Sequence, residues 1–312
     1  MRIHRAAIAL IMGASVMATP AVATAAYPGS NGRIAFEQGG FIYSIRPDGS
    51  DRRQLTTDTL SRSPRYSPDG RSIAFHRAGD IWVMKADGSG ARRVTNGAAK
   101  DFSPSWSPDG RRLVFSRTTD GTIAGRSLYV VPVAGGNAAR LTSKPDGCAL
   151  EPTWSADGRF VVYWDSCAGG ATSTGDAIRK VDIGTGRISS VVGVDGLAQP
   201  GGRVFFLGTG PDVTPDGHRV VFTAVNTSDS CGVAITDLSG GGFRFITAQV
   251  DCVFASDDPA VSPDGKKVVY TAGNENPQLD VARTAGSDQC CNAIYESGAN
   301  DFPTRPDWQP LP

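Results

Sequence analysis

A short motif recurs five times along the chain and limits what it can fold into. In residues 104–117 a Ser-Pro-Asp-Gly turn separates an aromatic residue, Trp106, from Leu113 and Phe115, which alternate with polar neighbours. A tight turn followed by alternation with a period of two is typical of a β-hairpin. The other turns lie at residues 67–70, 155–158 (with Ala156 in place of Pro), 214–217 and 262–265. The sequence therefore predicts a repeated hairpin.

Each repeat continues with a second pair of predicted strands. After the turn at 107–110 comes the apolar run 127–131, then a Gly-rich segment, then a short strand that ends at Thr142. This gives four short antiparallel strands in a period of roughly 40 to 60 residues, with insertions accounting for the longer spacings. Four strands per repeat are typical of a β-propeller blade.

The two ends of the chain carry incomplete and complementary repeats. Residues 31–36 begin at the turn and lack the preceding strand, whereas residues 305–310 have that strand and lack the turn and the other strands of a repeat. Joined, they make one whole blade, so that no long sheet edge is left open. We therefore predict an all-β fold, a six-bladed β-propeller of four-stranded antiparallel blades, in which the C-terminal strand joins the N-terminal blade.

These repeats resemble a known family. Residues 64–95 and 104–142 match nearly the whole pattern x-P-x-W-S-P-D-G-x-x-I-A-F, I-Y-V-M-D-x-D-G and R-x-L-T, and the last three blades match it more loosely. This pattern resembles the TolB-type, WD40-like propeller repeat. The resemblance implies that binding takes place on the face that gathers the loops between blades and those between the second and third strands.

The N-terminus and the charge balance indicate an exported protein. A basic start, an apolar stretch at 6–17 and small residues at 23–25 are typical of a secretory signal peptide, predicted at 1–26, with a single propeller domain at 27–312. An uncleaved anchor is the alternative. Lys and Arg number 31, as do Asp and Glu, so no basic surplus suggests nucleic-acid binding. We expect a secreted or periplasmic protein that does not span the membrane.

Six cysteines fit an oxidising compartment. In the blade arrangement Cys148 and Cys167 flank the hairpin of the fourth blade, and Cys231 and Cys252 flank the outer strands of the fifth, so we predict these two disulfides. Cys290 and Cys291 are adjacent. A vicinal disulfide, an intermolecular link and two free thiols all remain open for them.

The predicted binding face carries most of the candidate site residues. They are charged or aromatic and fall in the loops, or at the strand ends, opposite the Ser-Pro-Asp-Gly turns. The alternative is a solvated rim on which the disulfides only hold long loops. The candidates are Arg62, His76, Arg77, Asp101, Arg117, Glu151, Trp164, Asp165, Asp257 and Arg305. Residues 195–210 are an insertion, for which an extra strand is one explanation.

The sequence favours binding over catalysis. Beyond the predicted signal peptide only His76 and His218 occur, no G-x-S-x-G motif is present, and we predict no metal or cofactor. We expect a non-catalytic module that binds another envelope or extracellular protein. The alternatives are a glycan-binding propeller, a small-ligand pocket lined by Trp164, His76 and Arg117, and a carbohydrate-active enzyme that uses carboxylates such as Glu151, Asp165 and Asp257.

Overall fold

The computed structural model describes residues 28–122, 125–142, 148–166, 176–193, 196–199, 202–206, 210–226, 230–247, 249–251, 257–273, 278–285, 292–297 and 303–312. The predicted signal peptide and Cys167, Cys252, Cys290 and Cys291 lie outside these residues. Across the described ranges the chain forms strands and turns, with no helix of the length and apolarity needed to cross a membrane.

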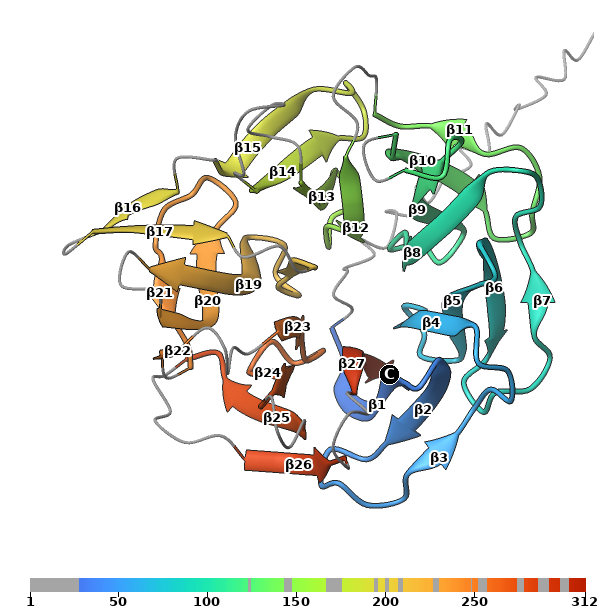
Figure 1. Cartoon of the computed structure of the whole chain (residues 1–312), viewed down its shortest axis with the longest axis horizontal. Coiled ribbons are helices and arrows are strands. Elements are labelled where there is room, and N and C mark those ends of the chain that lie inside the picture. The colour runs from blue at the N-terminus through green and yellow to red at the C-terminus, as the bar shows by residue number, and fades with distance from the viewer. Residues whose placement is uncertain are drawn as a thin grey trace, which may run out of the picture.

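Six sheets stand around a central axis, each with one strand next to the axis (Figure 1). Blade one contains β27 (Thr304–Leu311), β1 (Ser30–Gln38), β2 (Phe41–Ile45) and β3 (Arg53–Gln54). Blade two contains β4 (Ser61–Tyr66), β5 (Ser72–Arg77), β6 (Asp80–Lys85) and β7 (Arg92–Arg93). Blade three contains β8 (Lys100–Trp106), β9 (Arg112–Thr118), β10 (Ser127–Pro132) and β11 (Ala139–Arg140).

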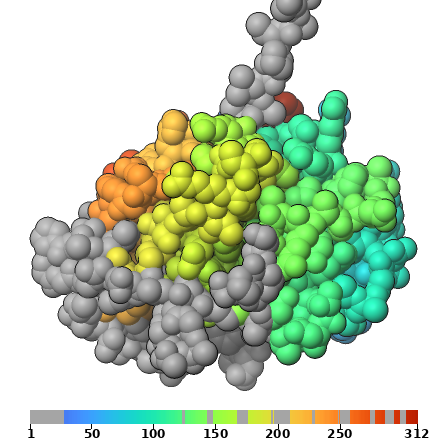
Figure 2. All heavy atoms as spheres, turned by 90° about the horizontal axis from the view of Figure 1, so that it is seen from above, coloured from blue at the N-terminus to red at the C-terminus, as the bar shows by residue number. Residues whose placement is uncertain are grey.

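The second half of the ring follows the same order, with additions in blade five. Blade four contains β12 (Ala149–Trp154), β13 (Phe160–Asp165), β14 (Ala177–Asp182) and β15 (Ile188–Val192). Blade five contains β18 (Asp212–Val213), β19 (Arg219–Asn226), β20 (Ser230–Asp237) and β21 (Arg244–Phe245), with β16 (Leu197–Gln199), β17 (Gly202–Phe206) and β22 (Val250–Asp251) added. Blade six contains β23 (Asp257–Val261), β24 (Lys267–Ala272), β25 (Gln278–Arg283) and β26 (Asn292–Glu296). Figure 2 shows the ring edge-on, with the outer strands of blades three and four along its rim.

The ring is closed by the last strand of the chain. β27 pairs with β1 in antiparallel register, with Ile34 opposite Trp308 and Ala35 opposite Asp307. The prediction that the two termini share one blade is therefore confirmed, as is the count of six blades.

The repeated turn is held by its own side chains. In blade three the hydroxyl of Ser107 donates to Asp109 Oδ1 at 2.5 Å and accepts from the amide of Arg112 at 2.9 Å. Gly110 has a φ of 66°, a left-handed conformation that glycine adopts without steric cost. The same hydroxyl-to-Asp bond occurs at the other four turns, with Thr214 in place of Ser in blade five.

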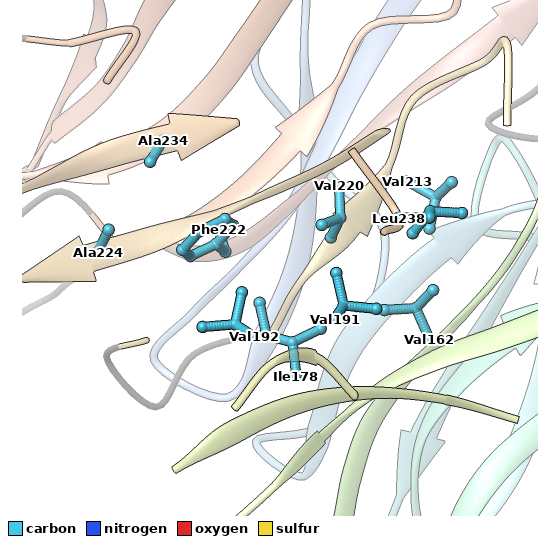
Figure 3. Packing of buried hydrophobic residues seen from close by; sticks show 10 residues of the cluster. All are labelled: Val162, Ile178, Val191, Val192, Val213, Val220, Phe222, Ala224, Ala234 and Leu238. Carbon is cyan, nitrogen blue, oxygen red and sulfur yellow. The ribbon is translucent and has the colours of Figure 1, made fainter. Parts of the chain in front are cut away.

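The hydrophobic core lies between the blades. In Figure 3, Val162, Ile178, Val191 and Val192 of blade four face Val213, Val220 and Phe222 of blade five. The recurring residue before each turn belongs to this packing: Tyr66, Trp106, Trp154, Val213, Val261 and Trp308 are all at most 5% exposed. These aromatics therefore hold neighbouring blades together.

The insertion before blade five forms a hairpin. β16 pairs with β17, and β17 pairs with the end of β19, where Phe206 lies opposite Ala224. The short inner strand β18 pairs with the beginning of the same strand. The expected extra strand is thus β17, which lengthens the inner edge of blade five.

The two described cysteines are disulfide-bonded. Cys148 and Cys231 are 1% and 0% exposed and lie at the strand ends opposite the Ser-Pro-Asp-Gly turns. The amide of Ser166 donates to the carbonyl oxygen of Cys148 at 3.3 Å, and Val250 lies opposite Cys231. Cys167 directly follows Ser166, and Cys252 is two residues after Val250. Each predicted partner is thus close in sequence to a residue that contacts or faces the described cysteine.

The pairing itself remains a prediction. We expect non-reducing peptide mapping to give Cys148 joined to Cys167 and Cys231 joined to Cys252. Because each bridge closes a loop of about 20 residues, its reduction is expected to lower the free energy of unfolding by about 3 kcal/mol. Peptides that join a cysteine of one pair to a cysteine of the other would contradict this connectivity.

Candidate functional site

One end of the central channel is lined by residues in an unusual backbone conformation. Five innermost strands contain a non-glycine residue with φ between 47° and 52°: Ser63, Ser103, Glu151, Asp258 and Arg305. We call these the bulge residues, and the end of the ring that carries them the bulge face. The opposite end, which carries the Ser-Pro-Asp-Gly turns, is the turn face. Left-handed non-glycine residues are strained and cluster at functional sites.

A following proline accounts for the bulges. Each bulge residue precedes a Pro, and at each of them the strand pairing shifts in register, as between Arg62 and Arg65. Proline cannot donate to the ladder, so the pairing skips at that point, and a bulge re-aims the neighbouring side chains. At the sixth equivalent position stands Gly210, where an added Cβ would lie 2.8 Å from Glu151 Oε2.

Arg305 fills the channel at the level of the bulge residues. Its Nη1 lies 2.5 Å from Glu151 Oε1, 3.1 Å from Ser63 Oγ and 3.3 Å from Ser103 Oγ. Its amide donates to Asp258 Oδ2 at 3.2 Å. The hollow left among these residues is only about 10 Å³, close to the least that holds one water molecule. The last strand of the chain thus joins blades two, three, four and six across the channel.

A second polar layer lies deeper in the channel. Arg65 Nη1 lies 3.3 Å from Asp307 Oδ1, and a hollow of about 40 Å³ is lined by these residues and Asp212. The amide of Tyr66 donates to Asp307 at 2.6 Å, and the amide of Val261 donates to Asp212 at 2.8 Å. Both carboxylates therefore join one innermost strand to that of the next blade.

Asp307 makes the stability dependent on pH. Burial raises the pKa of Asp307 from 3.8 to about 7, although Arg65 and the Tyr66 amide oppose the shift. Between pH 4 and 7 the folded protein keeps a proton that the unfolded chain has lost, so the free energy of unfolding falls as the pH rises.

We expect Asp307→Asn to flatten this slope, because its uncharged amide still accepts from Tyr66. The difference over the window is about 3 kcal/mol, and urea unfolding at pH 4, 5.5 and 7 measures it. Equal slopes for the two proteins would assign the pH dependence to other groups.

The predicted site residues lie together on the bulge face, and most of them form ion pairs, either with one another or with other residues. In the strand register Arg62 lies opposite His76, Asp101 opposite Arg117, and Leu150 opposite Trp164. The ion pairs are Arg62 with Glu37 at 2.6 Å, Arg77 with Asp58 at 2.8 Å, Arg117 with Asp101 at 2.6 Å and Asp165 with Arg179 at 2.6 Å. Asp257 begins β23 on the same face, and its side chain is outside the described part of the structure.

His76, Arg117 and Trp164 do not line the described channel hollows. His76 is 8% exposed, and burial together with Arg305, Arg62 and Arg126 lowers its pKa to about 3. Arg117 lies over Phe115 and Tyr129, and Trp164 packs against the core between blades four and five. These three side chains thus pack against residues of the blades.

Sequence reasoning missed Arg65, Asp212, Asp307 and Arg126. The first three directly precede the buried residue of an innermost strand, a position that faces the channel because side chains alternate along a strand. The alternation along these strands could therefore have identified the three residues from the sequence. Arg126 follows the segment between β9 and β10, and no local motif marks it.

A larger hollow lies at the turn face. It measures about 730 Å³ and lies between the turns of blades two and three. Its lining includes Met84, Trp106, Pro108 and Val133. The turn face thus has a roomier depression than the two hollows described in the channel. Across the described residues no cluster of three or more His, Cys, Asp or Glu is arranged to hold a metal ion.

The fold and the polar channel define a six-bladed β-propeller with a closed axis. The family model of the TolB beta propeller domain matches residues 41–192. The repeats within residues 41–192 are thus similar to the TolB propeller repeat, and the described chain as a whole folds as a six-bladed β-propeller. Among curated proteins no significant match was found.

Similar solved structures share the fold. TolB from Acinetobacter baumannii has a TM-score of 0.68 and 18% identity, over 89% of this chain and 67% of that one. A protein assigned as TolB from Agrobacterium tumefaciens has a TM-score of 0.65 and 19% identity, over 91% and 100%. Hydrazine synthase from Kuenenia stuttgartiensis has a TM-score of 0.68 and 14% identity, over 91% and 47%. The fold therefore occurs in an enzyme as well, and does not decide between binding and catalysis.

Proposed function

We propose that this protein is an exported, non-catalytic propeller that binds another envelope or extracellular protein on its bulge face. The observation that carries the proposal is the closure of the channel by Arg305, which leaves a hollow of only about 10 Å³ among the described bulge residues and so favours recognition on the surface. The ion pairs and bulges give that surface a fixed shape, and a fixed surface binds with a smaller entropy cost.

An exposed apolar residue stands on this face. Leu60 is 53% exposed, next to Asp58, which accepts from the amide of Leu60 and from Ser61 Oγ and so fixes the turn. Only Leu60 and Leu311 are large exposed hydrophobics in the described chain. A rigidly held apolar side chain beside charged groups is suited to a protein partner.

The alternatives have less support. No aromatic ring is broadly exposed among the described residues, so a stacking platform for a glycan is not found there. For a carbohydrate-active enzyme, two of the three proposed carboxylates are engaged: Glu151 by Arg305 and Asp165 by Arg179. Turnover of polysaccharides by the purified protein, lost in Glu151→Gln, would nevertheless replace the binding proposal.

The test is capture of a partner from the native envelope by crosslinking. The bait is the mature chain, compared with the double variant Leu60→Asp, Lys100→Glu, which alters two exposed residues of the bulge face. Arg111→Glu on the turn face is the matched control. We expect the double variant to lose the prey that the wild type and the control retain. Retention by the double variant and loss by the control would move the site to the turn face.

Export gives a separate expectation. If residues 1–26 are a signal peptide, N-terminal sequencing of the protein recovered outside the cytoplasm will begin near Tyr27. A full-length N-terminus on the exported protein would favour the uncleaved anchor.

A further inference from the structure

The bulge face carries a cation without a carboxylate partner. Arg126 forms no ion pair in the described ranges, and its Nε is buried without a hydrogen-bond partner. The guanidinium lies over the ring of Phe102, 4.2 Å from its centroid. The amide of Ala149 donates to the carbonyl oxygen of Arg126 at 3.3 Å, which ties its backbone to blade four. The side chain is thus positioned, and its charge is not neutralised.

Other cationic and polar groups lie close by. His76 stacks edge-on against Phe102, with ring centroids 5.4 Å apart, and lies opposite Arg62 in the strand register. The next residue, Ser103, contacts Arg305 Nη1 through its hydroxyl. A continuous set of contacts therefore runs from Arg126 through Phe102 to Arg305, with Arg62 at its edge.

Arg126 is the unpaired cation of this group. Arg62 is paired with Glu37, and Arg305 lies against both Glu151 and Asp258, whereas no carboxylate of the described residues forms an ion pair with Arg126. Burial and then the neighbouring Arg305 lower the pKa of Arg126, although Glu151 opposes the shift. The low pKa of His76 beside the same three arginines also indicates a positive potential here. A partly buried guanidinium that lacks an ion pair is stabilised when an anion binds.

We propose that Arg126, together with Arg305 and Arg62, forms a carboxylate-binding site at the bulge face, over blades two and three. Guanidinium groups bind carboxylates through paired, charge-assisted hydrogen bonds, and the partly exposed side chain of Arg126 has no carboxylate partner among the described residues. The site takes a carboxylate of a protein partner, either an acidic side chain or a chain terminus. That the carboxylate belongs to a protein partner rests on the proposed function. That the site binds a carboxylate at all is argued from the arginines alone.

The experiment titrates the full mature protein with short probes by calorimetry at low salt. The probes are an acetylated and amidated pentapeptide of alternating Gly and Glu, the same peptide with Gln in place of Glu, and the Gln peptide with a free C-terminus. We expect binding of the Glu peptide or of the free terminus, whichever is the natural source of the carboxylate. We expect no binding of the neutral peptide.

Variants separate this site from general charge attraction. Arg126→Gln is expected to weaken binding at least tenfold, Arg126→Lys by less because the charge is kept, and the exposed turn-face control Arg111→Gln not at all. Unchanged thermal melting of Arg126→Gln shows that the loss is not unfolding. Equal affinity of Arg126→Gln and wild type, or no binding of either carboxylate peptide, overturns the proposal.

Inorganic phosphate is the competing ligand. Tighter binding of phosphate than of both carboxylate peptides overturns the assignment to carboxylates. The peptide titration does not depend on any prey, so its result is independent of the crosslinking experiment. Peptide binding with no captured partner would reject the proposed function alone, and a captured partner with no peptide binding would reject this site alone.

Discussion

Trp308→Ala is expected to lower the free energy of unfolding by about 3–5 kcal/mol, the usual cost of removing a buried tryptophan side chain. Trp308 is 4% exposed and packs with Ile34 and Phe36 of its own blade and with Ala260 and Leu279 of blade six. Its indole Nε1 also donates to the Ala260 carbonyl oxygen at 3.1 Å, and that buried oxygen would lose its partner. Urea unfolding followed by tryptophan fluorescence measures the change.

The matched control lies three residues away on the same strand. Leu311 is 38% exposed, so Leu311→Ala is expected to change the free energy of unfolding by less than about 0.5 kcal/mol. If Trp308→Ala costs no more than Leu311→Ala, the C-terminal strand does not close the ring in solution.

Arg305→Ala is expected to lower the free energy of unfolding by about 3 kcal/mol. Removing one member of a buried ion pair leaves the other charge without compensation, at a cost of about 3–5 kcal/mol. The Glu151 side chain is 10% exposed and that of Arg305 is 35% exposed, which places the expected cost at the lower end of this range. Although burial opposes the charged form, Glu151 and Asp258 raise the pKa of Arg305, as expected for a cation held by two carboxylates.

A double-mutant cycle tests the cause. In Arg305→Ala the Glu151 carboxylate has lost its ion-pair partner. Because Glu151→Gln removes that uncompensated charge, we expect it to restore most of the stability when added to Arg305→Ala. The coupling energy from denaturant unfolding of the four proteins then exceeds about 1 kcal/mol. Additive effects would show that Arg305 stabilises the ring through packing, without its charge.

The fold was predictable from the sequence because each blade carries its own local signals. The Ser-Pro-Asp-Gly turn fixes each hairpin through a hydroxyl and a carboxylate only two residues apart, as at Ser107 and Asp109. The complementary ends also predicted the pairing of β27 with β1. Each of these features depends on residues near one another in sequence or on a pattern repeated along it.

The channel was less predictable because its contacts join distant parts of the chain. Arg305 meets Glu151, Ser63 and Ser103 only once six blades are arranged in a ring. The sequence placed Arg305 and Glu151 on the same face but did not indicate that they pair. A small-ligand pocket lined by His76, Arg117 and Trp164 was one alternative from the sequence, and in the described structure these residues make ring, ion-pair and core contacts.

The way the ring closes also has a consequence for synthesis. Thr304–Leu311 come after all the other strands in the sequence and supply both the inner strand of the first blade and the cation at the centre of the channel. A nascent chain can form its middle blades one by one, but blade one stays incomplete until β27 has left the ribosome. A product that stops short of this strand, through a premature stop codon or proteolysis, would expose the bare inner edge of β1, which is suited to joining a strand of another molecule.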